Sequence, residues 1–158
     1  MGYTVADNND LKFLLNPTNY LVELVTNSSS QYNAESGYFH KELNIVIEKS
    51  CSGFNFWVLC FIMISFMLLS YYKSAIKKVF VLPLALFFTY FLTIFANTSR
   101  IILSITGQKA ADNFISTRPH FVLHETIGTF VYIFFLISCY LAINFTLKKN
   151  TLCHAKPA

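Results

Sequence analysis

Charged residues are scarce in this sequence. Of its 158 residues, 13% are Asp, Glu, Lys or Arg, while 54% are hydrophobic. Ordinary soluble domains carry about a quarter charged residues, so the chain lacks the polar surface that water demands. Internal repeats and Pro-rich linkers are absent as well, and no two cysteines have the CxxC spacing of a disulfide oxidoreductase. These absences exclude a soluble enzyme, a disordered tail and a disulfide-rich secreted module.

Three windows without any charged residue decide the fold class. They span residues 50–72, 79–99 and 126–147 and hold 23, 21 and 22 residues. A helix needs about 20 apolar residues to cross a hydrocarbon core of about 30 Å, and each window is apolar on all sides. The sequence therefore predicts an all-α protein, a polytopic bundle of three transmembrane helices with a small mixed extracytoplasmic segment at its N-terminus.

Basic residues set the expected orientation. Lysines fill the tight connection 73–78 and return at Lys148 and Lys149, whereas six of the eight acids precede residue 51. Under the positive-inside rule the basic flanks belong to the cytoplasm, so the net charge of +4 signals topology rather than nucleic acid binding. The expected division is an extracytoplasmic segment 1–50, a transmembrane bundle 51–149 with an outer loop near 100–123, and a cytoplasmic tail 150–158.

The N-terminal segment is expected to have structure of its own. An exported segment of this kind normally follows a signal peptide or an upstream helix. Either the segment is translocated unaided or the authentic start lies before Met1 with one more span, and the second alternative is favoured. Residues 27–30 should break a first helix, and 37–49 alternates like an extended segment. The helix is expected to start at Asn16-Pro17, with one apolar face formed by Tyr20, Leu21, Leu24 and Val25.

Reactive side chains gather at the predicted outer membrane face. Cys51 precedes the first helix and His124 the third, while Asn97 and Arg100 close the second, which runs the other way. An imidazole can take the proton of a thiol and return it to a leaving amine. A fixed guanidinium can stabilise a thiolate or an oxyanion. This set favours nucleophilic acyl transfer.

The spacing around these residues sharpens the prediction. Gly53 follows the thiol by two places and lets a substrate backbone or a neighbouring helix approach. Asn97 and Arg100, at i and i+3, share a helix face, and so do His124 and Gly128 at i and i+4.

The second helix is longer than a membrane requires. A helix from Val79 to Gly107 would be about 44 Å long. It should therefore tilt, project outward or break near Arg100, which would face the bundle interior.

Each residue alone also has an ordinary structural interpretation. A cysteine near a helix end is usually a small buried residue, an arginine there usually extends to the headgroups, and a histidine is commonly a structural hydrogen-bonding group. Cys60 and Cys139 fall deep within the predicted spans and are interpreted as packing residues. Only the convergence of several such groups points to a site.

Three short blocks resemble the signature motifs of the exosortase/archaeosortase family. They are Ser50-Cys51-Ser52-Gly53, Ala96-Asn97-Thr98-Ser99-Arg100-Ile101 and His124-Glu125-Thr126-Ile127-Gly128. Their order, separations and position at outer helix ends match over roughly residues 37–147, and the compact length is most similar to the small exosortase K type. The chain departs from larger members in having fewer helices.

The resemblance implies a membrane cysteine protease and transpeptidase of a prokaryotic plasma membrane, with its active site outside the cytoplasm. Cys51 would be the nucleophile, Arg100 the stabiliser of the thiolate or oxyanion, and His124 the acid and base; the His-x-x-x-Gly spacing favours His124 over His120. The positioning residues would be Asn97, Ser52 and Gly53. The implied substrates are exported proteins with a C-terminal sorting signal made of a motif, a transmembrane helix and a basic cluster, with an amine as a further acceptor. No metal or organic cofactor is expected.

Other classes of function remain open at this point. A non-catalytic small membrane subunit could bind a lipid headgroup or a partner helix through Arg100 and His124, with Cys51 dispensable. Metal or haem binding by His40, His120 and His124 is disfavoured because no predicted span has a histidine in its interior. A transporter is disfavoured because no charged residue lies mid-membrane.

Overall fold

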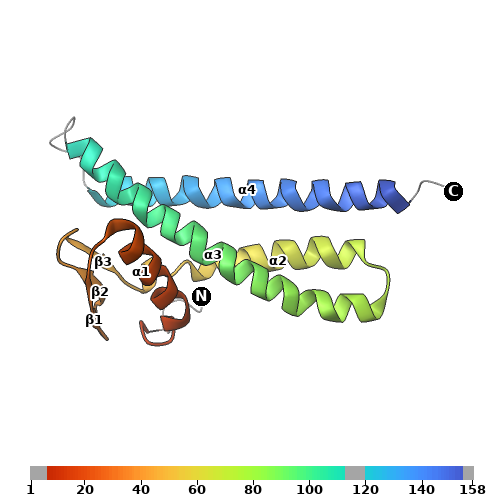
Figure 1. Cartoon of the computed structure of the whole chain (residues 1–158), viewed down its shortest axis with the longest axis horizontal. Helices are drawn as coiled ribbons and strands as arrows, with labels where there is room; N and C mark the ends of the chain where they lie inside the picture. Colours follow the sequence, from red (N-terminus) through yellow and green to blue (C-terminus); the bar gives the residue numbers. More distant parts are fainter. Residues whose placement is uncertain (1–6, 113–119, 155–158) are drawn as a thin grey trace.

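The computed structural model describes residues 7–112 and 120–154, with side chains described for 7–108 and 125–149. An N-terminal unit of one helix and a small sheet leads through a short 3-10 helix into three long helices (Figure 1). In chain order the elements are α1 (Lys12–Thr26), β1 (Ser30–Asn33), β2 (Gly37–His40), β3 (Ile45–Ile47), η2 (Lys49–Cys51), α2 (Phe54–Tyr71), α3 (Ala75–Asp112) and α4 (His120–His154).

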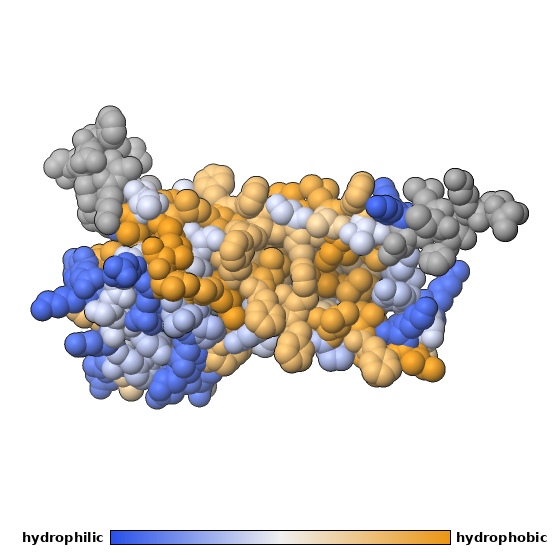
Figure 2. All heavy atoms as spheres, viewed as in Figure 1, coloured by the Kyte–Doolittle hydropathy of each residue, from blue (hydrophilic) through white to orange (hydrophobic). Residues whose placement is uncertain are grey.

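The three predicted spans are confirmed. Within the described residues, three helices are long and apolar enough to cross a membrane, over Lys49–Tyr71, Ala75–Gln108 and Glu125–Lys149. Figure 2 shows the result as an apolar band over the middle of the molecule, with hydrophilic residues gathered at both ends. The protein is thus a polytopic helical membrane protein. We call the end that holds Cys51 and Arg100 the outer end, after its predicted side, and the opposite end the lysine end.

The long second helix does not break. α3 is continuous from Ala75 to Asp112 and passes through Arg100 without interruption. It runs obliquely across α2 and α4 and contacts both, as well as α1 (Figure 1). The predicted break near Arg100 is therefore wrong. The outer part of α3, at Ile101 and Ile105, packs against the N-terminal unit.

α1 begins earlier than its sequence suggested. It starts at Lys12, so Pro17 lies inside the helix rather than at its first turn. Proline has no backbone N–H, which deprives the carbonyl four residues earlier, that of Phe13, of its helical partner. The Tyr90 hydroxyl of α3 donates to this same carbonyl at 2.7 Å. The carbonyl that Pro17 leaves without a helical partner therefore accepts a hydrogen bond that attaches α1 to α3.

The expected apolar face of α1 is not the one that packs inward. Tyr20, Leu24 and Val25 are exposed. The residues that α1 buries are Leu14, Leu15, Thr18, Asn19 and Val22. Asn19 forms hydrogen bonds inside the N-terminal unit, and Thr18 is fully buried there. A pattern of hydrophobic residues alone does not predict that these polar side chains face inward.

The extended segment predicted over 37–49 forms two strands of a small sheet. β2 pairs antiparallel with both β1 and β3, in the order β1-β2-β3. A turn at Asn44, whose φ is 51°, separates β2 from β3, and η2 then redirects the chain toward α2. The sequence prediction did not include β1, because its residues, Ser30–Asn33, are polar.

A chain of hydrogen bonds holds the interior of the N-terminal unit together. His40 is fully buried, with Nδ1 at 2.9 Å from the Ser28 hydroxyl and Nε2 at 2.8 Å from the Asn19 amide oxygen. Asn19 donates to the Ser30 hydroxyl, which donates to Glu23 at 2.6 Å. Both nitrogens of His40 thus have protein partners, and burial lowers the pKa of its imidazole. The Ser30 hydrogen bond lowers the pKa of the Glu23 carboxyl.

Candidate active site

Cys51 ends η2 and lies where the N-terminal unit meets the bundle. Its side chain is 7% exposed and belongs to an apolar cluster that includes Leu15, Ile47, Ile101 and Ile105. A cavity of about 40 Å³ adjoins it and is also lined by Ser104 and Gln108 of α3. Such a volume is enough for a water molecule but not for a peptide segment. Substrate would therefore have to part the N-terminal unit from α3 to reach the thiol.

The turn after Cys51 requires glycine. Gly53 has φ of +71°, in the left-handed region where L side chains are strained. A Cβ atom there would lie 3.2 Å from Thr93 and from Tyr132, and 3.3 Å from Asn97. The close approach expected at Gly53 is present. Ser52, fully buried, accepts a hydrogen bond from the Phe54 N–H and so helps to start α2.

Asn97 of α3 connects the thiol segment to α4. Its amide nitrogen donates to the backbone carbonyl of Cys51. Its amide oxygen accepts from the Tyr132 hydroxyl of α4 at 2.9 Å. One fully buried side chain on α3 therefore fixes η2 and α4 at the same point. An amide is suited to this role because it donates at one end and accepts at the other.

Arg100 faces the interior, as predicted. Its side chain is 9% exposed, and its guanidinium carbon lies 5.2 Å from the centre of the Tyr132 ring. Gly128 makes room for it, since a Cβ there would come within 3.0 Å of the Arg100 Cδ. Its Nε is buried and has no hydrogen-bond partner among the described residues. The same is true of the hydroxyls of Thr98, two residues earlier on α3, and Ser104, one helical turn later.

The side chain of His124 lies outside the described residues, as does that of His120. The backbone of His124 is in α4, one helical turn before Gly128. By the i, i+4 spacing, its position is on the α4 face on which Gly128 meets Arg100. The described residues thus join Asn97 to the backbone of Cys51, and Asn97 and Arg100 both contact Tyr132. The role of His124 stays a prediction.

Two residues near the site escaped the sequence analysis. Tyr132 hydrogen-bonds Asn97 and faces Arg100, and Ser104 lines the cavity beside Cys51. Spacing held a signal for each of them. Tyr132 is one turn after Gly128, and Ser104 is one turn after Arg100, so each continues a helix face already singled out.

No group of metal-ligating side chains occurs among the described residues. The architecture defines the protein as a polytopic helical membrane protein with a small mixed unit packed on its outer end. In comparisons with known proteins, no family model, no curated protein and no solved structure matches the chain.

Proposed function

We propose that the chain is an integral-membrane cysteine peptidase or transpeptidase that cleaves a C-terminal sorting signal of exported proteins at the outer face of a prokaryotic plasma membrane. Cys51 is the nucleophile, Arg100 stabilises developing negative charge, and His124 transfers the proton. Asn97, Ser52 and Gly53 position the thiol segment. No cofactor enters the reaction.

The reaction is acyl transfer in two stages. His124 takes the proton of the Cys51 thiol, and the sulfur attacks the scissile carbonyl to give a tetrahedral oxyanion beside the guanidinium. The C–N bond then breaks, and the leaving amine takes the proton from His124. An acceptor amine or a water molecule attacks the resulting thioester, which releases the product and restores the thiol.

The observation that carries the proposal is the state of Arg100. A charged side chain that is buried and has a nitrogen without a protein partner is costly, and such residues within membrane bundles normally serve a function. Asn97, one turn earlier on the same helix, holds the backbone of Cys51. An anionic intermediate formed on the thiol would supply an acceptor for the Arg100 Nε, which has none among the described residues.

The apolar exterior accounts for how a membrane substrate would arrive. Large apolar side chains are exposed along α2, α3 and α4. The transmembrane helix of a sorting signal can pack laterally against this surface and present its flanking motif at the outer end. The basic cluster that follows such a helix would then lie on the cytoplasmic side, in line with the positive-inside rule.

A second function is favoured by the burial of Cys51. A thiol in an apolar cluster behaves as a small hydrophobic residue. In that case the chain is a non-catalytic membrane subunit, and Arg100 with His124 binds a lipid headgroup or a partner helix.

Co-expression with a candidate substrate separates the two functions. The substrate carries a reporter, a short motif, a transmembrane helix and a basic cluster, and cleavage is followed by immunoblot. Cys51→Ala should abolish processing while the protein accumulates normally in the membrane. Cys60→Ala is the matched control, because it removes a buried thiol from the middle of α2 and should leave processing intact. Normal processing by Cys51→Ala would overturn the peptidase proposal and favour the subunit.

A further inference from the structure

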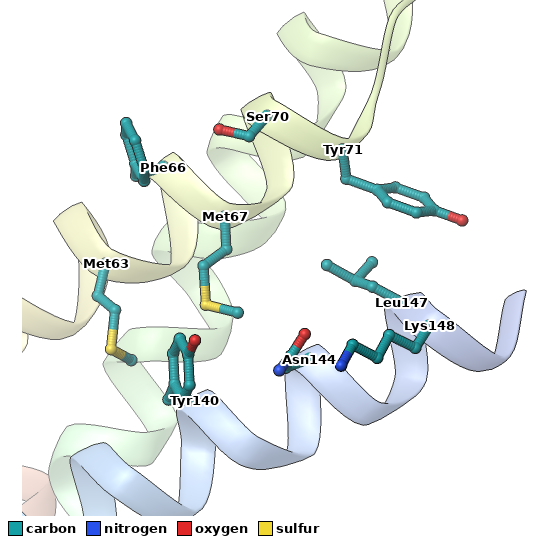
Figure 3. Close-up of a pocket in the computed structure, with 9 residues that line it drawn as sticks. All are labelled: Met63, Phe66, Met67, Ser70, Tyr71, Tyr140, Asn144, Leu147 and Lys148. Carbon is teal, nitrogen blue, oxygen red and sulfur yellow. The ribbon is translucent and has the colours of Figure 1, made fainter. Parts of the chain in front are cut away.

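A groove lies between α2 and α4 at the lysine end, far from the candidate active site along the bundle. It has a volume of about 530 Å³ and is the space shown in Figure 3. It extends from Met63 to Tyr71 on one wall and from Tyr140 to Lys148 on the other. Eight residues of helix correspond to about 12 Å, so the groove runs about that far into the bundle from its mouth.

The walls of the groove change character along its length. The inner part is lined by Met63, Phe66 and Met67 on α2, with the ring of Tyr140 opposite on α4 (Figure 3). The polar side chains cluster at the mouth: Ser70, Tyr71, Asn144 and Lys148. The amine of Lys148 points back along α4 toward Asn144 (Figure 3). An apolar slot with a polar mouth matches an amphiphile lying along the bundle.

The mouth offers hydrogen-bond donors and no anion. The residues that line the groove include one lysine but neither aspartate nor glutamate. Ammonium, hydroxyl and amide groups are the donors that bind phosphate oxygens. The mouth therefore complements a negative, acceptor-rich group. It does not complement the basic cluster that follows a sorting helix, since like charges repel.

We propose that this groove binds one anionic phospholipid, with its phosphate at Lys148 and Asn144 and the upper part of an acyl chain against Met63, Phe66 and Met67. The proposal goes beyond the peptidase function and does not depend on it. The lysine end is the predicted cytoplasmic side, where anionic lipids give the membrane surface its negative potential. Methionine and phenylalanine side chains supply a deformable apolar wall suited to a flexible chain.

Native mass spectrometry of the full chain in detergent tests the proposal. The probes are phosphatidylglycerol and phosphatidylcholine with identical acyl chains. We expect one phosphatidylglycerol per chain, retained about fivefold better than phosphatidylcholine. Both lipids carry a phosphate, but only phosphatidylglycerol has a net negative headgroup, and one lysine favours that charge by about 1 kcal/mol. Lys148→Gln should remove that preference. Lys77→Gln, which removes an equal charge from the exposed start of α3 outside the groove, should keep it.

A second variant tests the slot itself. Met67→Trp fills the groove with a larger apolar side chain and should reduce retention of both lipids. Equal loss of preference in Lys148→Gln and Lys77→Gln would contradict the proposal, because it would indicate attraction to the whole basic surface. Unchanged retention in Met67→Trp, or a lipid-free dimer as the main species, would also overturn it.

Discussion

The N-terminal unit and the outer end of the bundle both bury polar side chains, but they treat them differently. In the unit, the chain from Ser28 through His40, Asn19 and Ser30 to Glu23 gives each of these groups a hydrogen-bond partner, and the buried Thr18 hydroxyl is the exception among the described residues. On α3, the Arg100 Nε and the hydroxyls of Thr98 and Ser104 have none among the described residues. Buried polar groups are nearly always satisfied in folded proteins, so this difference needs an explanation.

The network around His40 stabilises the fold because its groups satisfy one another. The groups around Arg100 cost stability as they stand, and on the proposed function they are kept to bind an acceptor on the substrate. The Asn97 amide differs from these groups, since both of its ends are hydrogen-bonded, and it holds the backbone of Cys51.

The largest expected effect is the loss of substrate processing when Arg100 is replaced. Arg100→Ala should lower processing of a sorting substrate by about 10²–10³-fold, the usual loss when one donor to an oxyanion is removed. It should lower the thermal unfolding temperature in detergent less than Asn97→Ala does, because the contact with the Tyr132 ring is lost but no described hydrogen bond is. Lys77→Ala serves as the control for loss of a positive charge. A large drop in stability with normal processing would mean that Arg100 is a structural residue like His40.

Asn97 should show the opposite balance, with a large effect on stability. Asn97→Ala removes the hydrogen bonds to the Cys51 carbonyl and the Tyr132 hydroxyl, which should cost about 2–3 kcal/mol of unfolding free energy. Tyr132→Phe removes only one of these bonds and should cost about 1 kcal/mol. The measurement is thermal unfolding of the helical circular dichroism signal. If the two variants were equally stable, the bond to Cys51 would contribute nothing.

The network in the N-terminal unit should respond to pH. Burial lowers the pKa of His40 in the folded state, so the unfolded chain takes up its proton first as the pH falls. Stability should be constant above pH of about 6.5 and then fall by up to about 1.4 kcal/mol per pH unit below it. Hydrogen exchange of the sheet amides measures this. In His40→Gln the dependence should disappear, and its persistence would assign the titration to another group.

The smallest expected effect concerns the attachment of α1. Tyr90→Phe should cost about 1 kcal/mol, since the Phe13 carbonyl then has no donor. In a Pro17→Ala background the helix regains an N–H for that carbonyl, and the same change should cost less. A double-mutant cycle on thermal stability measures the difference. Equal costs in both backgrounds would show that the proline is unrelated to the Tyr90 contact.

The sequence predicted the parts of the fold that depend on long local patterns. The three spans follow from runs of apolar residues, and the inward position of Arg100 follows from its place near the end of one such run. The pairing of His40 with Asn19 and Ser28 could not be predicted, because it joins polar residues 12 and 21 positions apart that carry no periodic signal. Pro17 was misplaced because a tertiary contact compensates for the helical bond that it removes.

The candidate site, like the fold, could be predicted from the sequence only in part. Cys51, Asn97 and Arg100 were found from their helix ends and spacing, and the structure joins Asn97 to the backbone of Cys51 and places Arg100 one turn further along α3. The contribution of Tyr132 depends on how α4 rotates against α3, which no spacing within one helix specifies. The burial of Cys51 by Leu15 and Ile47 depends on how the N-terminal unit docks, and this too is a tertiary property.

The most direct test of the central claim is the reactivity of Cys51 in sealed, oriented membranes. The chain keeps Cys51, while the cysteines at 60, 139 and 153 are replaced by alanine. A small, charged methanethiosulfonate reagent is added from one side, and the labelling rate is compared between the parent and Arg100→Gln. We expect Cys51 to be labelled from the outer side, at a rate that falls at least tenfold in Arg100→Gln. Labelling only from the cytoplasmic side, or an equal rate in both proteins, would contradict it.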